Sequence, residues 1–165
     1  MFNIAIVDDE WAFLQLISSQ MLKTDYYNDI EIYKFLTCEK LLKEKEKINF
    51  HLIFMDIDLR ETDGIEFVHK HFYNTPIIYI TSHADRMADC IDHNVYKFVL
   101  KENIEVFFQN QFQDIYTRLK DSFIQINYNS NITLLDVNEV IYGTFNAMIN
   151  NPTYFDQDKL SLNRI

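Results

Sequence analysis

Glycine and proline are scarce in this chain, since its 165 residues include Gly 2 and Pro 2. Such low counts argue against a flexible linker, a glycine-rich phosphate-binding loop and a turn-dense all-β sandwich. Basic residues are also outnumbered, because 15 Lys and Arg face 25 Asp and Glu. The formal net charge of -10 disfavours nucleic-acid binding, which needs Lys and Arg gathered on one face.

The chain has only two cysteines, Cys38 and Cys90, and their spacing matches no metal-binding motif. We expect both to be reduced thiols that are buried or half-buried. No apolar run is long enough to span a bilayer, and no positively charged leader precedes a long apolar stretch. The sequence therefore predicts a soluble, cytoplasmic protein with no membrane partner.

Apolar residues make up 48% of the chain, which is ample for a core, and they fall into short runs that alternate with amphipathic segments. The runs bounded by turn residues predict five strands, at residues 2–7, 30–35, 50–55, 77–80 and 96–100. The periodicity predicts helices over residues 11–22, 63–72, 83–92 and 103–120, and a further helix after the capping residue Thr37. In the first helix, Trp11, Leu14, Ile17 and Met21 are spaced to share one face.

This alternation of strands and helices predicts an α/β fold, with a doubly wound parallel sheet covered by helices on both faces. In such sheets ligands bind beyond the carboxyl ends of the strands. The polar residues at these ends are Asp8, Asp9, Asp56, Thr81 and Lys101. They are scattered in the sequence, yet the fold is expected to bring them together.

The expected cluster fits phosphoryl transfer. Three carboxylates at one point require a cation, and Mg²⁺ prefers such oxygen ligands. Lys101 supplies positive charge and Thr81 a hydroxyl donor for an anion, while Asp56 can form an acyl phosphate. Each residue alone has a simpler interpretation: the acids as a solvated loop, Thr81 as a helix cap and Lys101 as a surface lysine. Their joint placement at the strand ends favours the functional one.

Five segments of this chain resemble the receiver domain of two-component response regulators. They are Ile6–Glu10, Leu52–Asp58, Asp63–Gly64, Pro76–Thr81 and Phe98–Lys101. The resemblance implies a flavodoxin-like sheet of five strands in the order 2-1-3-4-5 over residues 1–121. It also implies a phosphoryl acceptor that is not an enzyme, with a sensor histidine kinase as its partner and phosphohistidine as the donor.

The resemblance assigns a role to each matching residue. Asp56 is the implied phosphoacceptor. Asp9 and Asp56 are implied to hold Mg²⁺ directly, together with the backbone carbonyl of Asp58, while Asp8 acts through a metal-bound water. Asp8, Asp9, Asp56 and Asp58 thus form the expected metal site.

Thr81 and Lys101 are implied to bind the phosphoryl oxygens, and Thr81 and Phe98 to form the conformational switch. From the residues alone, Phe98 is better explained as a core residue. Two positions depart from the family pattern, because Glu102 follows Lys101 where a proline is usual, and a second usual proline is missing near Arg60. Neither departure removes a reactive group.

Residues 122–165 are expected to form a short β-rich appendage, beginning with a hairpin of residues 122–127 and 132–135. The stretch 136–142 resembles the opening of a LytTR-type DNA-binding domain, but the later strands of that family have no counterpart. After Asp121 only Lys159 and Arg164 carry positive charge. We therefore expect a partial LytTR-like segment that packs on the receiver, pairs strands with a second copy or frays. DNA binding is expected only where a complete LytTR domain is present.

Two alternatives remain open. Asp56 and Asp58 after an apolar strand also resemble the nucleophile motif of haloacid-dehalogenase-type phosphatases, in which the second Asp is the general acid. That family places the motif on its first strand, whereas here a strand ending in Asp8 and Asp9 comes earlier. The other alternative is a receiver-like binding module that is not phosphorylated.

Overall fold

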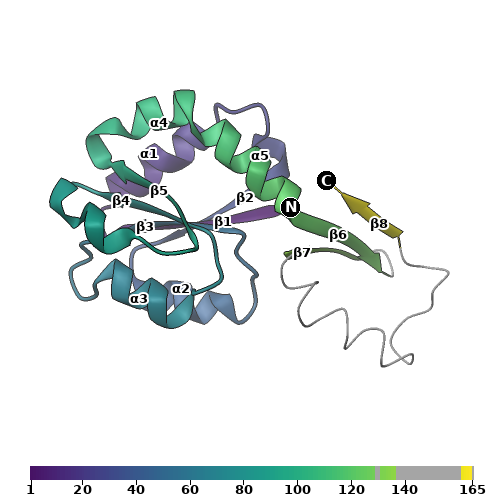
Figure 1. Cartoon of the computed structure of the whole chain (residues 1–165), viewed down its shortest axis with the longest axis horizontal. Helices are drawn as coiled ribbons and strands as arrows, with labels where there is room; N and C mark the ends of the chain where they lie inside the picture. The colour runs from purple at the N-terminus through teal and green to yellow at the C-terminus, as the bar shows by residue number, and fades with distance from the viewer. Residues whose placement is uncertain (129–130, 137–160, 165) are drawn as a thin grey trace. The chain divides into compact units, whose positions relative to one another are not determined.

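The computed structural model describes residues 1–128, 131–136 and 161–164, and it describes side chains as far as residue 123. The chain divides into two compact units, residues 1–112 and 113–165. The elements that begin in the first unit are β1 (Phe2–Val7), α1 (Trp11–Met21), η1 (Tyr27–Asp29), β2 (Ile30–Phe35), α2 (Cys38–Lys45), β3 (Leu52–Asp56), α3 (Gly64–His71), β4 (Ile77–Thr81), η2 (Ala84–Cys90), β5 (Val95–Leu100), η3 (Lys101–Asn103), α4 (Ile104–Asn110) and α5 (Phe112–Ser122) (Figure 1).

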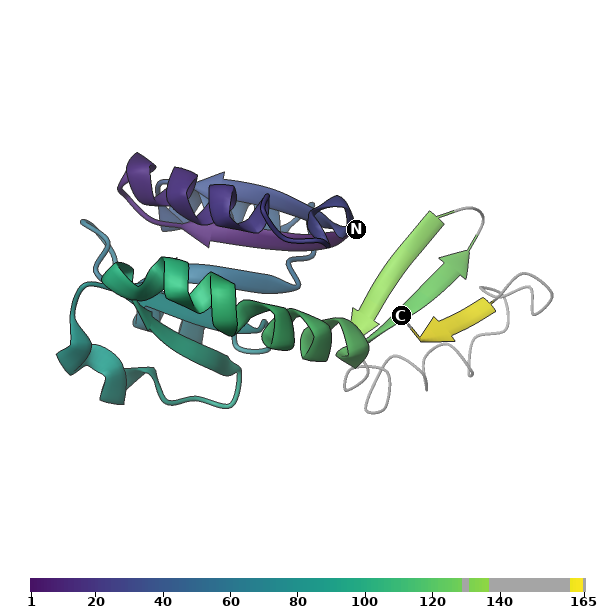
Figure 2. The same ribbon diagram turned by 90° about the horizontal axis from the view of Figure 1, so that it is seen from above.

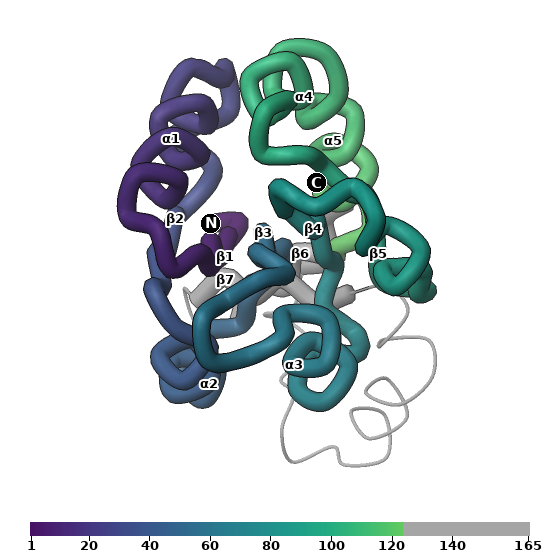
Figure 3. The backbone as a smooth tube through the Cα atoms, turned by 90° about the vertical axis from the view of Figure 1, so that its left-hand side faces the viewer, coloured from purple at the N-terminus to yellow at the C-terminus, as the bar shows by residue number. Residues whose placement is uncertain are grey.

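The five strands of the first unit form one all-parallel sheet in the order β2-β1-β3-β4-β5, which confirms the predicted doubly wound fold. Helices α1 and α4 lie on one face of the sheet, and α2 and α3 lie on the other (Figure 3). Every residue of β3 and β4 is buried, whereas the edge strands β2 and β5 have exposed positions. Because the strands are parallel, all their carboxyl ends lie at one edge of the sheet.

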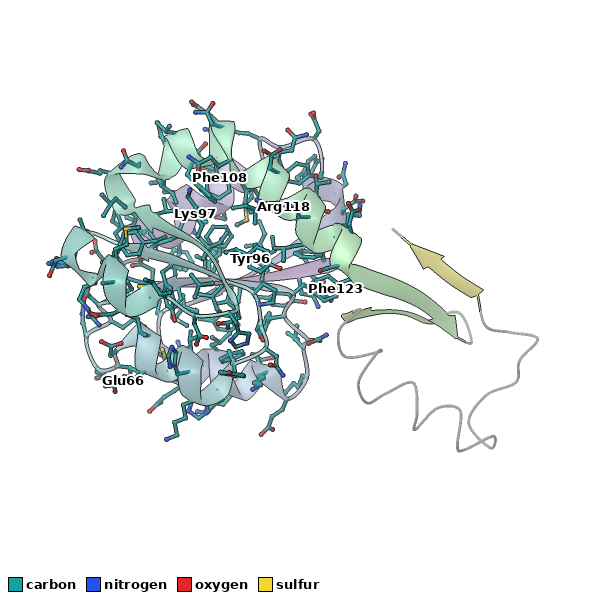
Figure 4. The ribbon with its side chains drawn as sticks, viewed as in Figure 1. Glu66, Tyr96, Lys97, Phe108, Arg118 and Phe123 are labelled. Atoms are coloured by element: carbon teal, nitrogen blue, oxygen red, sulfur yellow. The ribbon has the colours of Figure 1, made fainter. Side chains whose placement is uncertain are left out.

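An aromatic cluster fills the face of the sheet beneath α4. The ring of Phe54, on β3, stacks on that of Phe108 at 5.8 Å with an interplanar angle of 18°. Figure 4 labels Phe108, which points inward from α4. Phe107 and Phe112 lie 6.4 and 5.6 Å from Phe54 between ring centroids. These large apolar rings anchor α4 through burial and through their tilted or stacked contacts.

The prediction of a single helix over residues 103–120 is wrong, because α4 ends at Asn110 and α5 begins at Phe112. Gln111 has φ -131° and ψ -31°, which is outside the helical region. Phe112 is the first residue of α5, and its ring lies 4.8 Å from that of Phe108. The aromatic rings therefore pack together at a break in the helix. The spacing of apolar residues in the sequence does not reveal this break.

Two further helix predictions need correction. The segment predicted as a helix over residues 83–92 forms the 3₁₀ turns of η2, in which only Cys90 is buried. A helix in a protein is stabilised mainly by packing of one apolar face, and η2 has no such face. Trp11 was expected on the buried face of α1, but it is 55% exposed, while Leu14, Ile17 and Met21 are buried as predicted. Both Cys38 and Cys90 are buried free thiols, as expected.

In the second unit, α5 leads into a three-stranded antiparallel sheet in the order β7-β6-β8 (Figure 2). The hairpin of β6 (Phe123–Tyr128) and β7 (Asn131–Asp136) confirms the predicted one, and β8 (Ser161–Arg164) adds a strand that the sequence did not suggest. Most of the stretch that resembles a LytTR domain, residues 137–142, lies outside the described residues. Where the chain is described, no helix combines the length and the apolar character needed to cross a membrane.

Candidate functional site

The carboxyl ends of four neighbouring strands bring together the polar residues predicted from the sequence. Asp8 follows β1, Asp56 ends β3, Thr81 ends β4 and Lys101 follows β5. All four side chains are buried, with exposures of 1%, 4%, 0% and 8%. Charged residues are almost never buried unless they are paired, so their burial points to mutual contacts.

Lys101 is the centre of these contacts. Its Nζ lies 2.8 Å from Asp8 Oδ2 and donates a hydrogen bond of 2.9 Å to Asp56 Oδ2. The ammonium also lies 4.3 Å from the centroid of the Phe13 ring. Lys101 is therefore not the surface lysine of the simpler interpretation, even though Glu102 replaces the proline that usually follows it.

Burial shifts the pKa values of the two carboxylates upward. Desolvation raises the pKa of Asp8 to about 6, although the hydrogen bond from Lys101 acts in the opposite direction. Desolvation also raises the pKa of Asp56, again against the effect of Lys101. For Lys101 burial acts to lower the pKa, but the hydrogen bonds to Asp8 and Asp56 outweigh it and raise the pKa on balance. The protein thus concentrates negative charge where water screens it poorly.

Asp9 completes an acidic cluster with Asp8 and Asp56. Each of the three offers a carboxylate oxygen, and these oxygens lie within 4.8 Å of one another. Asp9 is half-buried and accepts an ion pair from Arg60, with Nε 2.7 Å from Oδ2. An all-oxygen set of carboxylates matches the preference of Mg²⁺, which binds through one or two carboxylates while it keeps several waters. The residues therefore fit a hard divalent cation.

Thr81 points toward Asp58 in this structure. Its hydroxyl donates a hydrogen bond of 2.8 Å to Asp58 Oδ2 and accepts one of 3.0 Å from the backbone N–H of His83. The backbone N–H of Asp58 in turn points to Asp56 Oδ1, at 3.4 Å. Phe98, on β5, is half-buried and packs against the core on the α2 and α3 face of the sheet. Of the predicted switch residues, only Thr81 belongs to the polar network around Asp56.

Gly64 explains how α3 can begin so close to Asp56. A Cβ atom at this position would lie 2.2 Å from the backbone oxygen of Asp56, so any other residue would force the backbone apart. The N–H of Gly64 donates a 2.8 Å hydrogen bond to the carbonyl of Ile57, and Asp63 caps the helix. The sequence motif marked Gly64 as the end of the acidic loop but gave no reason for glycine.

Sequence reasoning assigned no function to Arg86, which lies in η2 and forms ion pairs with three carboxylates. The distances are 3.2 Å to Asp58, 2.7 Å to Asp63 and 3.0 Å to Asp89. Asp58 and Asp63 are distant from Arg86 in the sequence, so no local spacing signals these pairs. The pair between Arg60 and Asp9 was missed for the same reason.

Residues 4–109 match the sequence pattern described as the response regulator receiver domain. The chain belongs to the response regulator receiver domain family. All the site residues described above lie inside the matching region. No curated protein sequence matches the chain.

Solved receiver structures have the same fold as this domain. TrrA, a response regulator protein from Thermotoga maritima in complex with Mg²⁺ and BeF, is 22% identical, with a TM-score of 0.57; the match covers 72% of this chain and 99% of that one. A receiver domain protein from Methanospirillum hungatei JF-1 is also 22% identical, with a TM-score of 0.58 and coverage of 72% and 94%. The RcsB response regulator of Salmonella typhimurium is 18% identical, with a TM-score of 0.60; the match covers 71% of this chain and spans only 60% of RcsB.

Proposed function

We propose that this receiver domain accepts a phosphoryl group on Asp56 from the phosphohistidine of a sensor histidine kinase in the cytoplasm, and that it then changes conformation to control an output. The observation that carries the proposal is the contact of Lys101 Nζ with both Asp56 and Asp8, beside Asp9. A structural ion pair would need only one buried carboxylate for one lysine. Here the excess of carboxylates fits a site for a divalent cation and a phosphoryl group.

In the proposed transfer, an oxygen of Asp56 attacks the phosphorus atom while the bond from phosphorus to the donor imidazole breaks. The imidazole nitrogen keeps the electron pair of that bond, and Asp56 becomes an acyl phosphate. Asp9, Asp56 and the backbone carbonyl of Asp58 would hold Mg²⁺ directly, and Asp8 would act through a metal-bound water. When bound, the metal would supply positive charge to the phosphoryl oxygens. Lys101 would bind a phosphoryl oxygen with the ammonium that it now shares between two carboxylates.

The proposed switch is a change of partner by Thr81. Its hydroxyl now donates to Asp58, and this hydrogen bond would have to break before Thr81 could donate to a phosphoryl oxygen on Asp56. Because a hydroxyl has one proton, it cannot donate fully to both acceptors. The movement of Thr81, with Phe98 as a second switch residue, would then favour a different conformation of the output face.

The output itself is proposed to pass through the second unit or a second copy of the chain. A LytTR-like role for residues 122–165 remains a proposal, as does a homodimer formed by pairing of strands. RcsB, one of the similar structures, has been solved as a complex with DNA. For this chain DNA binding would require a complete LytTR domain, since Lys159 and Arg164 alone provide few phosphate contacts.

Two observations favour this proposal over the alternatives left open by the sequence. A phosphatase of the haloacid-dehalogenase type would use Asp58 as a general acid, whereas here the Asp58 carboxylate is paired with Arg86 and accepts from Thr81. A receiver that had lost phosphorylation would have no need to keep Asp8, Asp56 and Lys101 buried together beside Asp9.

The deciding experiment is incubation with acetyl phosphate and Mg²⁺, followed by measurement of the intact mass. We expect one added phosphoryl group, which is absent in Asp56→Asn and in the presence of a chelator. Repeated turnover of a phosphate ester would instead support the phosphatase. The absence of an adduct under every condition would support the unphosphorylated binding module.

A further inference from the structure

We propose that Arg86 is a positioning residue for the switch: it holds the Asp58 carboxylate in the orientation that keeps Thr81 away from Asp56. This inference rests on the proposed function of Asp56 and names a residue that regulates the same site. It predicts that Arg86 restrains the resting conformation, although it touches neither Asp56 nor a phosphoryl group.

The first step is the geometry of the guanidinium group. Each of its three nitrogens faces a different carboxylate: Nη1 faces Asp58, Nη2 faces Asp63 and Nε faces Asp89. A guanidinium group is planar and directs its donors in fixed directions, so three partners fix its orientation. The side chain of Arg86 is 27% exposed, and isolated exposed ion pairs contribute little. A network with three partners restrains the group more strongly than any single pair.

The second step is that the two carboxylate oxygens of Asp58 have different partners. Oδ1 is paired with Arg86 Nη1 at 3.2 Å, while Oδ2 accepts the hydroxyl of Thr81 at 2.8 Å. The Asp58 side chain is 37% exposed, so without an anchor it could rotate into solvent. Because Arg86 fixes Oδ1, Oδ2 stays directed at Thr81. Arg86 therefore stabilises a hydrogen bond in which it takes no part.

The third step is the anchoring of Arg86 itself. Its strongest partner is Asp63, whose Oδ1 caps α3 by accepting the N–H groups of Ile65 and Glu66 at 2.9 and 3.1 Å. The hydrogen bond from Arg86, helped by these backbone donors, outweighs desolvation and lowers the pKa of Asp63. Asp63 is thus a charged residue held at the N-terminus of α3, and its ion pair with Arg86 links η2 to this helix. The contacts run from α3 through Arg86 and Asp58 to Thr81.

The test is the affinity of the full chain for beryllofluoride in the presence of Mg²⁺, followed by the fluorescence of Trp11, which lies two residues from Asp9 and is the only tryptophan. Wild type is compared with Arg86→Gln, Thr81→Ala and the double variant. We expect Arg86→Gln to bind beryllofluoride about threefold to tenfold more tightly, the range that corresponds to one hydrogen bond. We expect no such gain in the Thr81→Ala background.

Asp89→Asn is the matched control, because it removes one negative charge that faces Arg86 within η2, while its amide oxygen can still accept from Nε and the pair with Asp58 stays in place. It should bind beryllofluoride like wild type. An Arg86→Gln variant with unchanged affinity would overturn the inference. A gain of the same size with and without Thr81 would overturn it too, since Arg86 would then act by another route.

A second measurement keeps the inference separate from the proposed function. If wild type fails to bind beryllofluoride, the proposed function fails, and urea unfolding of the metal-free variants decides the inference. Effects of Arg86→Gln and Thr81→Ala on the unfolding free energy that are not additive would show that both act through Asp58. Strictly additive effects would contradict it.

Discussion

At the scale of single residues, the site combines too many carboxylates with too few cations. Asp8 and Asp56 share Lys101, and Asp9 adds a third carboxylate within 4.8 Å of the other two. Buried charges are tolerated only where partners compensate them, and one ammonium compensates one carboxylate. The raised pKa values of Asp8 and Asp56 reflect this shortage of positive charge in a buried position. The proposed phosphoryl group would add further negative charge, so we expect the site to accept it only with an added cation.

Arg60 supplies part of the missing charge in the metal-free protein, and removing it should tighten Mg²⁺ binding. Its Nε lies 2.7 Å from Asp9 Oδ2, an oxygen that would have to exchange Arg60 for the metal. The Arg60 side chain is 79% exposed, so the competition is weak. We expect Arg60→Ala to raise the affinity for Mg²⁺ about twofold to fivefold, the range typical of exposed pairs. A titration with Mg²⁺ alone, followed by Trp11 fluorescence, measures it.

The control for Arg60 is Lys47→Ala, which removes the same charge from an exposed pair with Glu44. Lys47 precedes β3, whereas the site lies at the carboxyl ends of the strands. A general effect of net charge would change the affinity equally in both variants. A lower affinity in Arg60→Ala would mean that Arg60 helps to hold Asp9 in place and does not compete for it.

The residues that sequence reasoning placed correctly all stand at strand ends. Asp8, Asp56, Thr81 and Lys101 could be brought together from the sequence, because the parallel sheet fixes where strand ends lie. The contacts of Arg60 and Arg86 could not, since they depend on the paths of loops and on side-chain rotamers. Even for Thr81, the sequence placed the hydroxyl but not its partner Asp58.

At the scale of elements, the beginning of α3 determines how the loop after Asp56 closes. Asp63 caps the helix, and Gly64 lets it approach the backbone of Asp56 without a side chain in between. The pair Asp58 and Asp63 also forms an isolated antiparallel bridge across this loop. The loop is therefore held by backbone contacts at both ends, while its Asp58 and Asp63 carboxylates are paired with Arg86.

Substitution of Asp63 should separate helix capping from ion pairing. Asp63→Ala removes both functions and should lower the free energy of unfolding by about 1–2 kcal/mol, as for other lost caps. Asp63→Asn keeps an oxygen that can accept the N–H groups of Ile65 and Glu66, and it loses only the charge that faces Arg86. We expect it to cost less than half as much, measured by urea unfolding followed by circular dichroism. Equal losses in the two variants would show that the ion pair, and not the cap, stabilises this turn.

Element boundaries show where local patterns stop being informative. Thr37 caps α2 as predicted, because the capping signal is local. The break between α4 and α5 was not predicted, since the apolar stripe continues through Gln111 while the backbone does not. The 3₁₀ form of η2 was missed because a polar segment satisfies several turn geometries equally, and only its contacts decide among them.

At the scale of the whole molecule, two buried groups give opposite dependences of stability on pH. One lies at the amino ends of the strands and the other at their carboxyl ends. His51, before β3, accepts a 2.8 Å hydrogen bond at Nδ1 from the backbone N–H of Asn3, and burial lowers its pKa to about 4. Asp8, at the carboxyl end of β1, has its pKa raised by burial to about 6. In the unfolded chain the two side chains have their ordinary pKa values, 6.5 for His51 and 3.8 for Asp8.

The signs follow from which state binds the proton. Between about pH 6.5 and 4 the unfolded chain protonates His51 before the folded protein does, so stability falls as the pH falls. Between about pH 6 and 3.8 the folded protein protonates Asp8 first, so stability rises as the pH falls. Each effect amounts to about 3 kcal/mol over its range, at about 1.4 kcal/mol per unit of pKa shift. In metal-free wild type they largely cancel.

Single substitutions should remove this cancellation and expose each dependence. We expect the metal-free His51→Gln variant, whose side-chain oxygen can still accept the N–H of Asn3, to become more stable as the pH falls from 7 to 4. The metal-free Asp8→Asn variant should become markedly less stable over the same range. Urea unfolding followed by Trp11 fluorescence at several pH values measures both slopes. If the free energy of unfolding changed with pH in the same way in both variants, the opposite roles assigned to His51 and Asp8 would be contradicted. Because Asp56 shares the upward shift of Asp8, a small residual gain on acidification is expected even in wild type, and it should vanish in Asp56→Asn.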